Sequence, residues 1–310
     1  MPPSASTAEL DAVLRTVTAP PVLRKLERLR LSAQHSVTQR PGNTRLVRAT
    51  QASGLELANH KAYTPGDDLR HLDWNAYGRL NERLIKTFQA EREAPVHLLL
   101  DASASMAVPA DDGKLAFAAG LAAGLGYIAL RHSNPVRVVT LADHGGSRMS
   151  PLLRHAQRLP DLIAFLTRLT PSGPTRLGEG IDAYLRSMQL PGTAVVLSDF
   201  LVEPPIYERA LDQLCGRGYH VVALRIIGAR ERDPSALPRQ VRLADAETGG
   251  ERLVDLTAAH RDLYARAVAE HLDQLKRWCE SRAIGYATAD TTAGIETCLL
   301  ADLPRAGVLH

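Results

Sequence analysis

Oxygen-bearing side chains follow a largely apolar run, Val96–Leu100, at the end of the first third of the chain. A short, continuous apolar run of this kind is typical of a buried strand in a parallel sheet. Asp101, Ser103 and Ser105 come directly after it at alternate positions. In near-extended backbone, side chains two residues apart point the same way, so these three can converge on one point. The spacing therefore predicts a site for a hard cation.

Two later segments supply further oxygen atoms. The apolar run 193–198 ends at Asp199, and the Pro- and Gly-containing loop 171–178 carries Thr175. In an open α/β sheet, ligands bind beyond the carboxyl ends of the strands, where Asp101 and Asp199 fall. Ser and Asp after a strand are also common helix caps, but three such segments in this order favour a metal site over capping. The predicted metal ligands are Asp101, Ser103, Ser105, Thr175 and Asp199.

This set of two carboxylates and three hydroxyls suits Mg²⁺, with Mn²⁺ or Ca²⁺ as alternatives, and leaves a coordination position for an oxygen from a partner. The five residues resemble the metal-ion-dependent adhesion site, MIDAS, of von Willebrand factor A domains. The resemblance implies that the hydroxyls of Ser103, Ser105 and Thr175 bind the cation directly, and that the two carboxylates act largely through bound water. The cation then stays electrophilic toward an incoming carboxylate.

Composition places the chain among soluble globular proteins, with 310 residues, 45% hydrophobic and 23% charged. No apolar run has the length of a membrane span, and the first residues lack the order of a signal peptide. We therefore expect no membrane span and a cytoplasmic location. The cysteines, Cys215, Cys279 and Cys298, are widely spaced and form no Cys-x-x-Cys pair, which indicates neither a disulfide framework nor a zinc site.

The first fifty residues contain a basic cluster although the net charge is only +3. Helices are expected over 7–17 and 21–34, and the second carries an apolar stripe suited to docking. The basic residues between positions 21 and 50 form either a solvated helix face or a surface for nucleic acid, anionic lipid or an acidic protein. The basic residues that accompany a single acid, Glu27, are Arg24, Lys25, Arg28, Arg30, Arg40, Arg45 and Arg48.

Segment 36–94 is predicted to be β-rich and contains a dense polar motif, residues 63–75. Pro65 and Gly66 followed by acids indicate a turn. The acids and His71 could form a second metal or acid–base site. Alternatively, arginines pair with the acids above a buried tryptophan, and the motif is structural or binds a partner, which we favour. The candidate partner-binding residues are Asp67, Asp68, Arg70, Asp73 and Trp74.

The motif also carries a family resemblance. Tyr63-x-Pro-Gly-Asp-Asp-Leu-Arg-x-Leu-Asp-Trp-Asn, then Lys86-x-Phe-x-x-Glu91-Arg-Glu, then Asp101-x-Ser-x-Ser-Met, is similar to the signature of the bacterial domain-of-unknown-function 58 (DUF58) family from about Leu23 onward. The resemblance implies a von Willebrand factor A-like domain behind a family-specific β segment, often encoded beside a MoxR-type AAA+ ATPase. Family members commonly carry membrane helices ahead of this region, so this chain resembles the short soluble branch.

Alternating strand and helix patterns after residue 95 predict an α/β fold with a doubly wound, mainly parallel sheet. The expected division is N-terminal helices over 1–35, a β-rich segment over 36–94 and a von Willebrand factor A-like domain over 95–310 with a hairpin insertion at about 239–256. A long helix is expected over 258–281.

These features favour a non-enzymatic, metal-dependent adaptor protein acting with a MoxR-type AAA+ ATPase and a client. A metal-dependent hydrolase or phosphatase is the alternative, but Ser103 stands where an aspartyl phosphatase needs a second acid. The sequence also has neither a Gly-x-Ser-x-Gly elbow nor a P-loop. Nucleic-acid binding through the basic N-terminal helix lacks interleaved aromatic residues.

Overall fold

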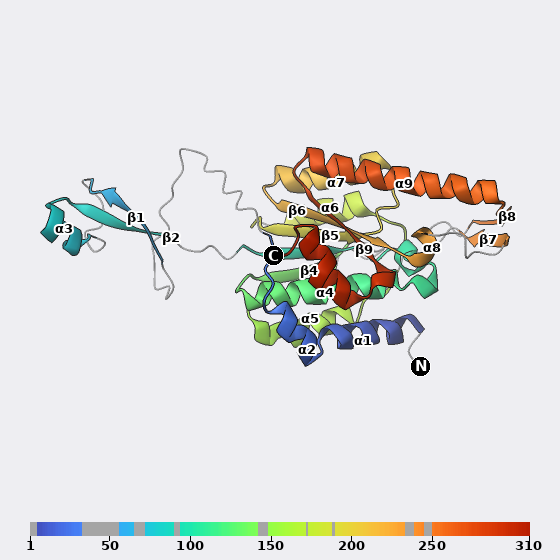
Figure 1. Ribbon diagram of the computed structural model, residues 1–310, viewed down its shortest axis with the longest axis horizontal. Coiled ribbons are helices and arrows are strands. Elements are labelled where there is room, and N and C mark those ends of the chain that lie inside the picture. The colour runs from blue at the N-terminus through green and yellow to red at the C-terminus, as the bar shows by residue number, and fades with distance from the viewer. Residues whose placement is uncertain are drawn as a thin grey trace. The chain divides into compact units, whose positions relative to one another are not determined.

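A five-stranded parallel sheet forms the centre of the larger of two compact units (Figure 1). Its strands lie in the order β4-β3-β5-β6-β9, and every neighbouring pair is parallel. The chain moves from β3 to β4 and then crosses back to β5, so the winding direction reverses beside β3. The predicted α/β, doubly wound sheet is confirmed. The strands are β3 (Val96–Leu100), β4 (Val136–Thr140), β5 (Thr193–Ser198), β6 (His220–Ile227) and β9 (Gly285–Asp290).

The computed structural model describes residues 5–32, 56–64, 72–89, 94–141, 148–171, 173–187, 190–232, 239–244 and 250–310. Residues 1–36 and 94–310 belong to the larger unit, and residues 37–93 form the smaller one. The N-terminal helices, expected as a separate region over 1–35, are therefore part of the unit that holds the sheet.

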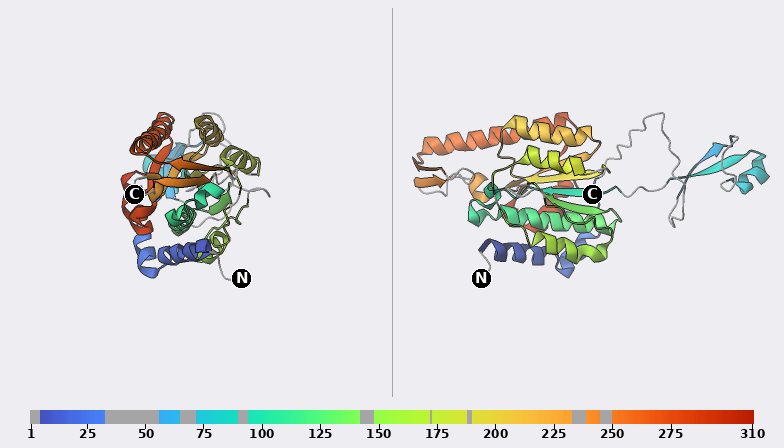
Figure 2. Two further views of the ribbon diagram at one scale, coloured as in Figure 1. Left: turned by 90° about the vertical axis from the view of Figure 1, so that its right-hand side faces the viewer. Right: turned by 180° about the vertical axis from the view of Figure 1, so that it is seen from behind.

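Helices cover both faces of the sheet (Figure 2). Successive strand residues point to opposite faces, so Leu98 and Leu100 enter one core cluster and Leu99 enters the other. The first cluster includes α4 (Lys114–Arg131), α5 (Leu159–Leu166) and the C-terminal helical turns over 295–305. The second cluster includes α6 (Leu177–Ser187), α7 (Pro204–Gly216) and the end of α9 (Ala258–Ser281).

Helix α4 is buried along nearly its whole length, as the run of Ala, Gly and Leu predicts. A Cβ atom at Gly120 or Gly124 would come within 2.6 Å of Val13 or Leu299, so glycine permits close helix packing here. Among the described residues, α4 is also the one helix with the length and apolar character of a membrane span, but 94% of that stretch is buried inside the protein.

Two helices, α1 (Ala5–Val17) and α2 (Pro20–Leu26), pack on α4. The second ends well before the expected residue 34, because the chain turns into an extended pairing with the C-terminus. Arg30 N donates to His310 O at 2.8 Å, and Ser32 N donates to Val308 O at 3.0 Å. Val22 and Leu26 are buried, which gives α2 its expected docking face.

The predicted hairpin insertion forms its own two-stranded antiparallel sheet from β7 (Gln240–Ala244) and β8 (Glu251–Asp255). Helix α9 follows with the expected bounds. The helix is only partly buried: Leu275 is fully covered, whereas Leu263 is 65% exposed.

In the smaller unit, β1 (Glu56–Ala62) pairs antiparallel with β2 (Leu84–Gln89), which agrees with the β-rich character expected of this segment. A short helix, α3 (Trp74–Leu80), lies between them in sequence. The carboxylate of Asp73 accepts from the backbone N–H groups of Asn75 and Ala76, so this acid caps the helix.

Candidate functional site

Asp101 lies immediately after β3 and is only 1% exposed. Its Oδ1 accepts the backbone N–H of Ser103 at 2.9 Å. Its Oδ2 accepts the hydroxyl of Ser198, the last residue of β5, at 2.6 Å. Both carboxylate oxygens are therefore held by neighbouring protein groups, and the side chain is fixed before any ligand arrives.

The three predicted hydroxyl ligands form a chain. Ser103 Oγ and Ser105 Oγ lie 2.9 Å apart, and Ser105 Oγ lies 3.3 Å from Thr175 Oγ1. The backbone N–H of Ala104 donates to Gly173 O at 2.9 Å, which fixes the loop of Thr175 against the end of β3. Ser103 is fully buried, whereas Ser105 and Thr175 are partly exposed. The site is thus open to solvent on its hydroxyl side.

Asp199, just after β5, has the same 1% exposure as Asp101 but a different environment. Its Oδ2 accepts from the ammonium group of Lys114 at 3.0 Å, and its Oδ1 accepts from the backbone N–H of Leu201 at 3.2 Å. Lys114 Nζ also contacts Glu231, which belongs to the short helix α8 (Ala229–Arg232). Arg225 Nε donates to the backbone oxygen of Asp199 at 3.1 Å.

The buried charges shift one another's ionisation. Burial, followed by the nearby Asp199 carboxylate, raises the pKa of Asp101, although the hydrogen bond from Ser198 works in the opposite direction. Burial alone would lower the pKa of Lys114. The carboxylates of Asp199 and Glu231 outweigh burial, so the Lys114 pKa is raised and the side chain stays an ammonium ion. The site therefore places the Asp101 carboxyl group, whose charged form is disfavoured by burial, near a buried ammonium ion that two other carboxylates hold.

Phe200, which follows Asp199, adopts a left-handed backbone conformation with φ of 53°. This conformation costs a non-glycine residue on the order of 1–2 kcal/mol. It is held by two hydrogen bonds: Phe200 N donates to Ser198 Oγ at 3.0 Å, and Phe200 O accepts from His271 Nε2 of α9 at 2.9 Å. Strained residues of this kind concentrate at functional sites. The bonds of Ser198 link Phe200 to Asp101.

The donor set fits a hard divalent cation. Hydroxyl and carboxylate oxygens are the ligands that Mg²⁺ prefers, and the three hydroxyls approach one another at hydrogen-bonding distances. Within the described part of the chain there is no cluster of three or more His, Cys, Asp or Glu side chains suited to a metal ion. A cation at this site would therefore depend on the hydroxyls, with Asp101 and Asp199 already engaged by protein donors.

The structure brings the hydroxyls of Ser103, Ser105 and Thr175 together and places Asp101 and Asp199 at the ends of neighbouring strands. Sequence reasoning missed Lys114. Its position was a signal that could have been used. Lys114 is the first residue of a long apolar helix, and a cation is unfavourable there because the amino end of the helix dipole is positive. A lysine at such a position suggests that it has acidic partners. Ser198, which holds both Asp101 and Phe200, was also missed.

The polar motif 63–75 is only partly described, because Asp67, Asp68 and Arg70 lie outside the described residues. Asp73 caps α3 and is 8% exposed. The expectation that Trp74 would be buried in a structural motif is wrong, since its side chain is 67% exposed. Trp74 is the first residue of a seven-residue helix that buries none of its side chains.

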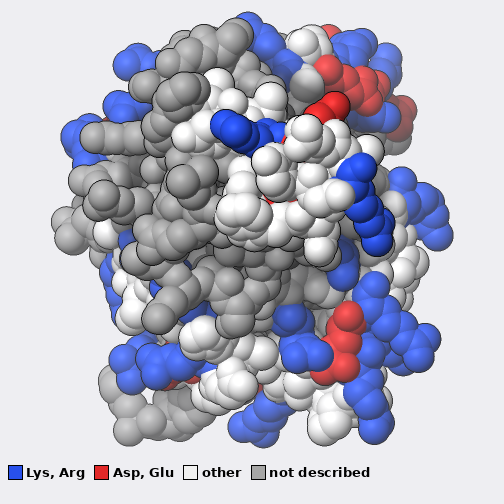
Figure 3. Space-filling view, turned by 90° about the vertical axis from the view of Figure 1, so that its left-hand side faces the viewer, with Lys and Arg blue, Asp and Glu red and all other residues white. Residues whose placement is uncertain are grey.

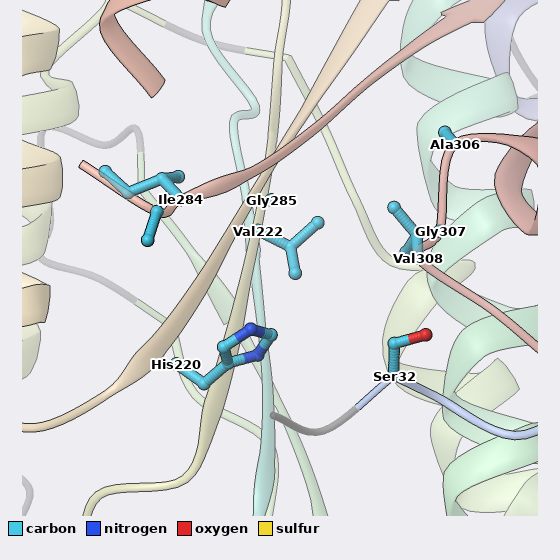
Figure 4. Close-up of a pocket in the computed structure, with 9 residues that line it drawn as sticks. Ser32, His220, Val222, Ile284, Gly285, Ala306, Gly307 and Val308 are labelled. Atoms are coloured by element: carbon cyan, nitrogen blue, oxygen red, sulfur yellow. The ribbon is translucent and has the colours of Figure 1, made fainter. Parts of the chain in front are cut away.

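A cavity of about 250 Å³ lies near the amino ends of β6 and β9 (Figure 4). Asp101 and Asp199 follow the carboxyl ends of their strands, at the opposite end of the sheet. It is lined mainly by Val222, Ile284 and small residues near the C-terminus, with His220 and Ser32 as polar contributors. The hydroxyl of Ser32 lies 3.2 Å from Nδ1 of His310. Burial lowers the pKa of His220.

Charge is uneven on the face shown in Figure 3, where Lys and Arg side chains outnumber Asp and Glu among the described residues. In the basic N-terminal segment, Lys25 pairs with Glu296. Glu27, the one acid expected there, accepts from the hydroxyl of Tyr127 at 2.8 Å and lies 3.6 Å from Arg131. Arg40, Arg45 and Arg48 lie outside the described residues.

Comparison with known proteins identifies the family. The chain matches the model of the family described as "Protein of unknown function DUF58" over residues 59–274. This match spans more than half of the chain, so the protein belongs to the DUF58 family, as its motifs predict.

The chain is similar to "Uncharacterized protein Rv1480" of Mycobacterium tuberculosis, with 29% identity over 72% of this chain and 71% of the relative. It is also similar to "Uncharacterized protein MAV169" of Mycobacterium avium, with 34% identity over 36% of this chain and 67% of the relative.

Two solved structures share a distant likeness. The "conserved hypothetical protein BatB from Bacteroides thetaiotaomicron" has 15% identity and a TM-score of 0.40, covering 69% of this chain and 98% of that one. The "von Willebrand factor type A from Catenulispora acidiphila" has 16% identity and a TM-score of 0.37, covering 73% of this chain and 43% of that one.

Proposed function

We propose that this protein is a non-enzymatic, metal-dependent adaptor that binds a carboxylate of a partner protein through a cation held at the end of β3. The observation that carries the proposal is the hydroxyl chain of Ser103, Ser105 and Thr175, which leads from a fully buried serine to the surface. Mg²⁺ is the cation best suited to these ligands, with Mn²⁺ or Ca²⁺ as alternatives. Such a cation would supply an electrophilic position for a carboxylate oxygen.

The protein groups around the carboxylates support binding rather than catalysis. Asp101 accepts from Ser103 N and Ser198 Oγ through its two oxygens, which leaves it poorly placed to attack a phosphoester as a nucleophile. Asp199 is similarly held by Lys114 and Leu201. Both acids are thus suited to orienting ligands and bound water. This arrangement favours the adaptor over a hydrolase or phosphatase.

By resemblance to other DUF58 proteins, we propose a MoxR-type AAA+ ATPase and a client protein as partners, in a cytoplasmic setting. The partner would contribute an Asp or Glu at the partly exposed side of the hydroxyl chain, near Ser105 and Thr175.

Isothermal titration calorimetry with Mg²⁺ tests the metal site directly. Wild-type protein is expected to bind, and Asp101→Asn is expected to lose about tenfold or more in affinity, because groups that orient metal ligands contribute on this scale. Asp212→Asn, which alters an exposed acid paired with Arg282, serves as the matched control and keeps the wild-type affinity. Equal Mg²⁺ affinity in wild type and Asp101→Asn would exclude this site.

Affinity capture of partners then tests the adaptor role, using wild type and Asp101→Asn as baits with Mg²⁺ and with chelator. The proposal expects a protein that wild type retains in Mg²⁺ and releases in chelator, and that Asp101→Asn does not retain. Identical sets of retained proteins for both baits would show that recognition does not depend on the metal site.

A further inference from the structure

A buried ammonium group lies directly behind the candidate metal site. Lys114 is 1% exposed, and its Nζ contacts the carboxylates of Asp199, at 3.0 Å, and Glu231. Removing an ammonium ion from water costs several kcal/mol before its partners compensate. The position at the start of α4 adds an unfavourable interaction with the helix dipole. A lysine in this place is therefore hard to explain by packing alone.

The network also contains a second buried cation. Arg225 is 0% exposed, and its Nε donates to the backbone oxygen of Asp199. The neighbouring ionisable groups are thus three acids, Asp101, Asp199 and Glu231, and two cations, Lys114 and Arg225; Asp101 takes part through its charge interaction with Asp199. With all acids ionised, three negative and two positive charges leave a net charge of −1.

This count has a direct consequence for ligands. A divalent cation changes the network from −1 to +1, and a partner carboxylate then brings it to zero. Without the charge of Lys114, the same cation would bring the network only to zero, and a carboxylate would make it negative. The one-unit difference between the two cases does not depend on the surrounding charges.

We propose that Lys114 is a positioning and specificity-determining residue: a resident cation that orients Asp199 and keeps the metal-loaded site positive enough to select a carboxylate ligand. This inference rests on the proposed function, and it adds a residue that lies behind the metal ligands. Lys114 weakens the binding of the divalent cation and strengthens the binding of the carboxylate. Glu231 has the opposite effects, because it offsets the charge of Lys114 and lies 11% exposed in the same cluster.

The test uses Mn²⁺ as the metal probe and acetate as the carboxylate probe on the full chain. Electron paramagnetic resonance of free Mn²⁺ gives the metal affinity. Water proton relaxation of the Mn²⁺ complex gives the acetate affinity, since acetate displaces bound water. Lys114→Met is expected to bind Mn²⁺ about tenfold more tightly and acetate about tenfold more weakly, a conservative scale for one buried charge.

Two further variants keep the test decisive if Lys114→Met folds poorly, which circular dichroism would reveal. Glu231→Gln is expected to shift both affinities in the reverse directions. The double variant Lys114→Met/Glu231→Gln removes one charge of each sign, so both affinities should return to within about threefold of wild type if net charge governs them.

The outcomes separate the two proposals. If wild type binds no Mn²⁺, the proposed function fails, and the role of Lys114 fails with it. If wild type binds Mn²⁺ but the variants leave both affinities unchanged, only the role of Lys114 is overturned. A Lys114→Met or double variant that is folded yet binds both probes more weakly would likewise overturn it, because Lys114 would then only support the fold.

Discussion

Two regions carry dense polar motifs, but they have opposite physical characters. At the end of β3, Asp101 and Asp199 are each 1% exposed and fully engaged with protein donors. In the smaller unit, α3 exposes three large apolar side chains at three-residue spacing: Trp74 at 67%, Tyr77 at 36% and Leu80 at 64%. The first region can bind through buried charge, whereas α3 offers exposed apolar surface that a partner could bury. Motifs of similar density thus need different tests.

The largest expected effect is on the free energy of unfolding, when a buried ion pair is compared with an exposed one. Asp199→Ala would leave the buried ammonium of Lys114 with one carboxylate fewer, and removing one partner of a buried ion pair costs about 3–5 kcal/mol. Urea unfolding of the metal-free protein measures this loss. The control is Asp212→Ala, the same substitution in an exposed ion pair with Arg282 at 2.8 Å, which should cost less than about 1 kcal/mol. Equal losses for both variants would refute the distinction between buried and exposed charge.

A second, smaller effect on the free energy of unfolding should come from His97 of β3, the strand that ends before Asp101, and it should depend on pH. His97 of β3 is 2% exposed, and its ring lies 5.7 Å from Tyr184 and 5.4 Å from Tyr219, between ring centroids. Burial, with a smaller contribution from Arg137, lowers the pKa of His97 from 6.5 to about 4. Between these values the unfolded chain binds a proton that the folded protein does not. The free energy of unfolding should therefore fall by about 3 kcal/mol as the pH drops from 6.5 to 4.

His97→Phe isolates this contribution, because it keeps an aromatic ring between Tyr184 and Tyr219 but removes the titrating group. Unfolding of wild type and variant is followed by urea titration across the same pH range. The difference in unfolding free energy between the two proteins should change by about 3 kcal/mol over this window. A difference that stays constant with pH would mean that His97 is not neutral in the folded protein.

Local patterns were sufficient to predict most of what positions the site. Apolar runs identify β3 and β5, and the parallel arrangement then brings Asp101 and Asp199 to the ends of neighbouring strands. The contact between Lys114 and Glu231 could not be predicted in this way, because the two residues are 117 positions apart and no local pattern joins them. The left-handed conformation of Phe200 could not be predicted either, since nothing in a phenylalanine favours it and its hydrogen bonds to Ser198 and His271 appear only in the folded structure.

In the smaller unit, the same kind of reasoning went wrong for a local reason. Trp74 was expected to be buried beneath acids paired with arginines, but Asp73 caps a helix that begins with Trp74. A carboxylate can pair with an arginine or accept backbone N–H groups as a helix cap, and the residue type alone does not distinguish the two roles. The helix then presents Trp74 outward.

The exposure of Trp74 leads to the smallest expected effect on stability and a large one on binding. Trp74→Ala should change the free energy of unfolding by no more than about 0.5 kcal/mol, as is usual for exposed positions. If α3 contacts the partner, the same variant should lose about 2 kcal/mol or more of binding energy, because tryptophan is a frequent hot spot. The measurement is retention of the captured partner by Trp74→Ala, compared with Leu190→Ala, which alters a 69% exposed leucine of the larger unit.

Loss of retention by Trp74→Ala but not by Leu190→Ala would assign recognition to both regions, since the metal site and α3 would each be required. If Trp74→Ala retains the partner fully and Asp101→Asn loses it, then of these two regions the metal site alone determines partner binding.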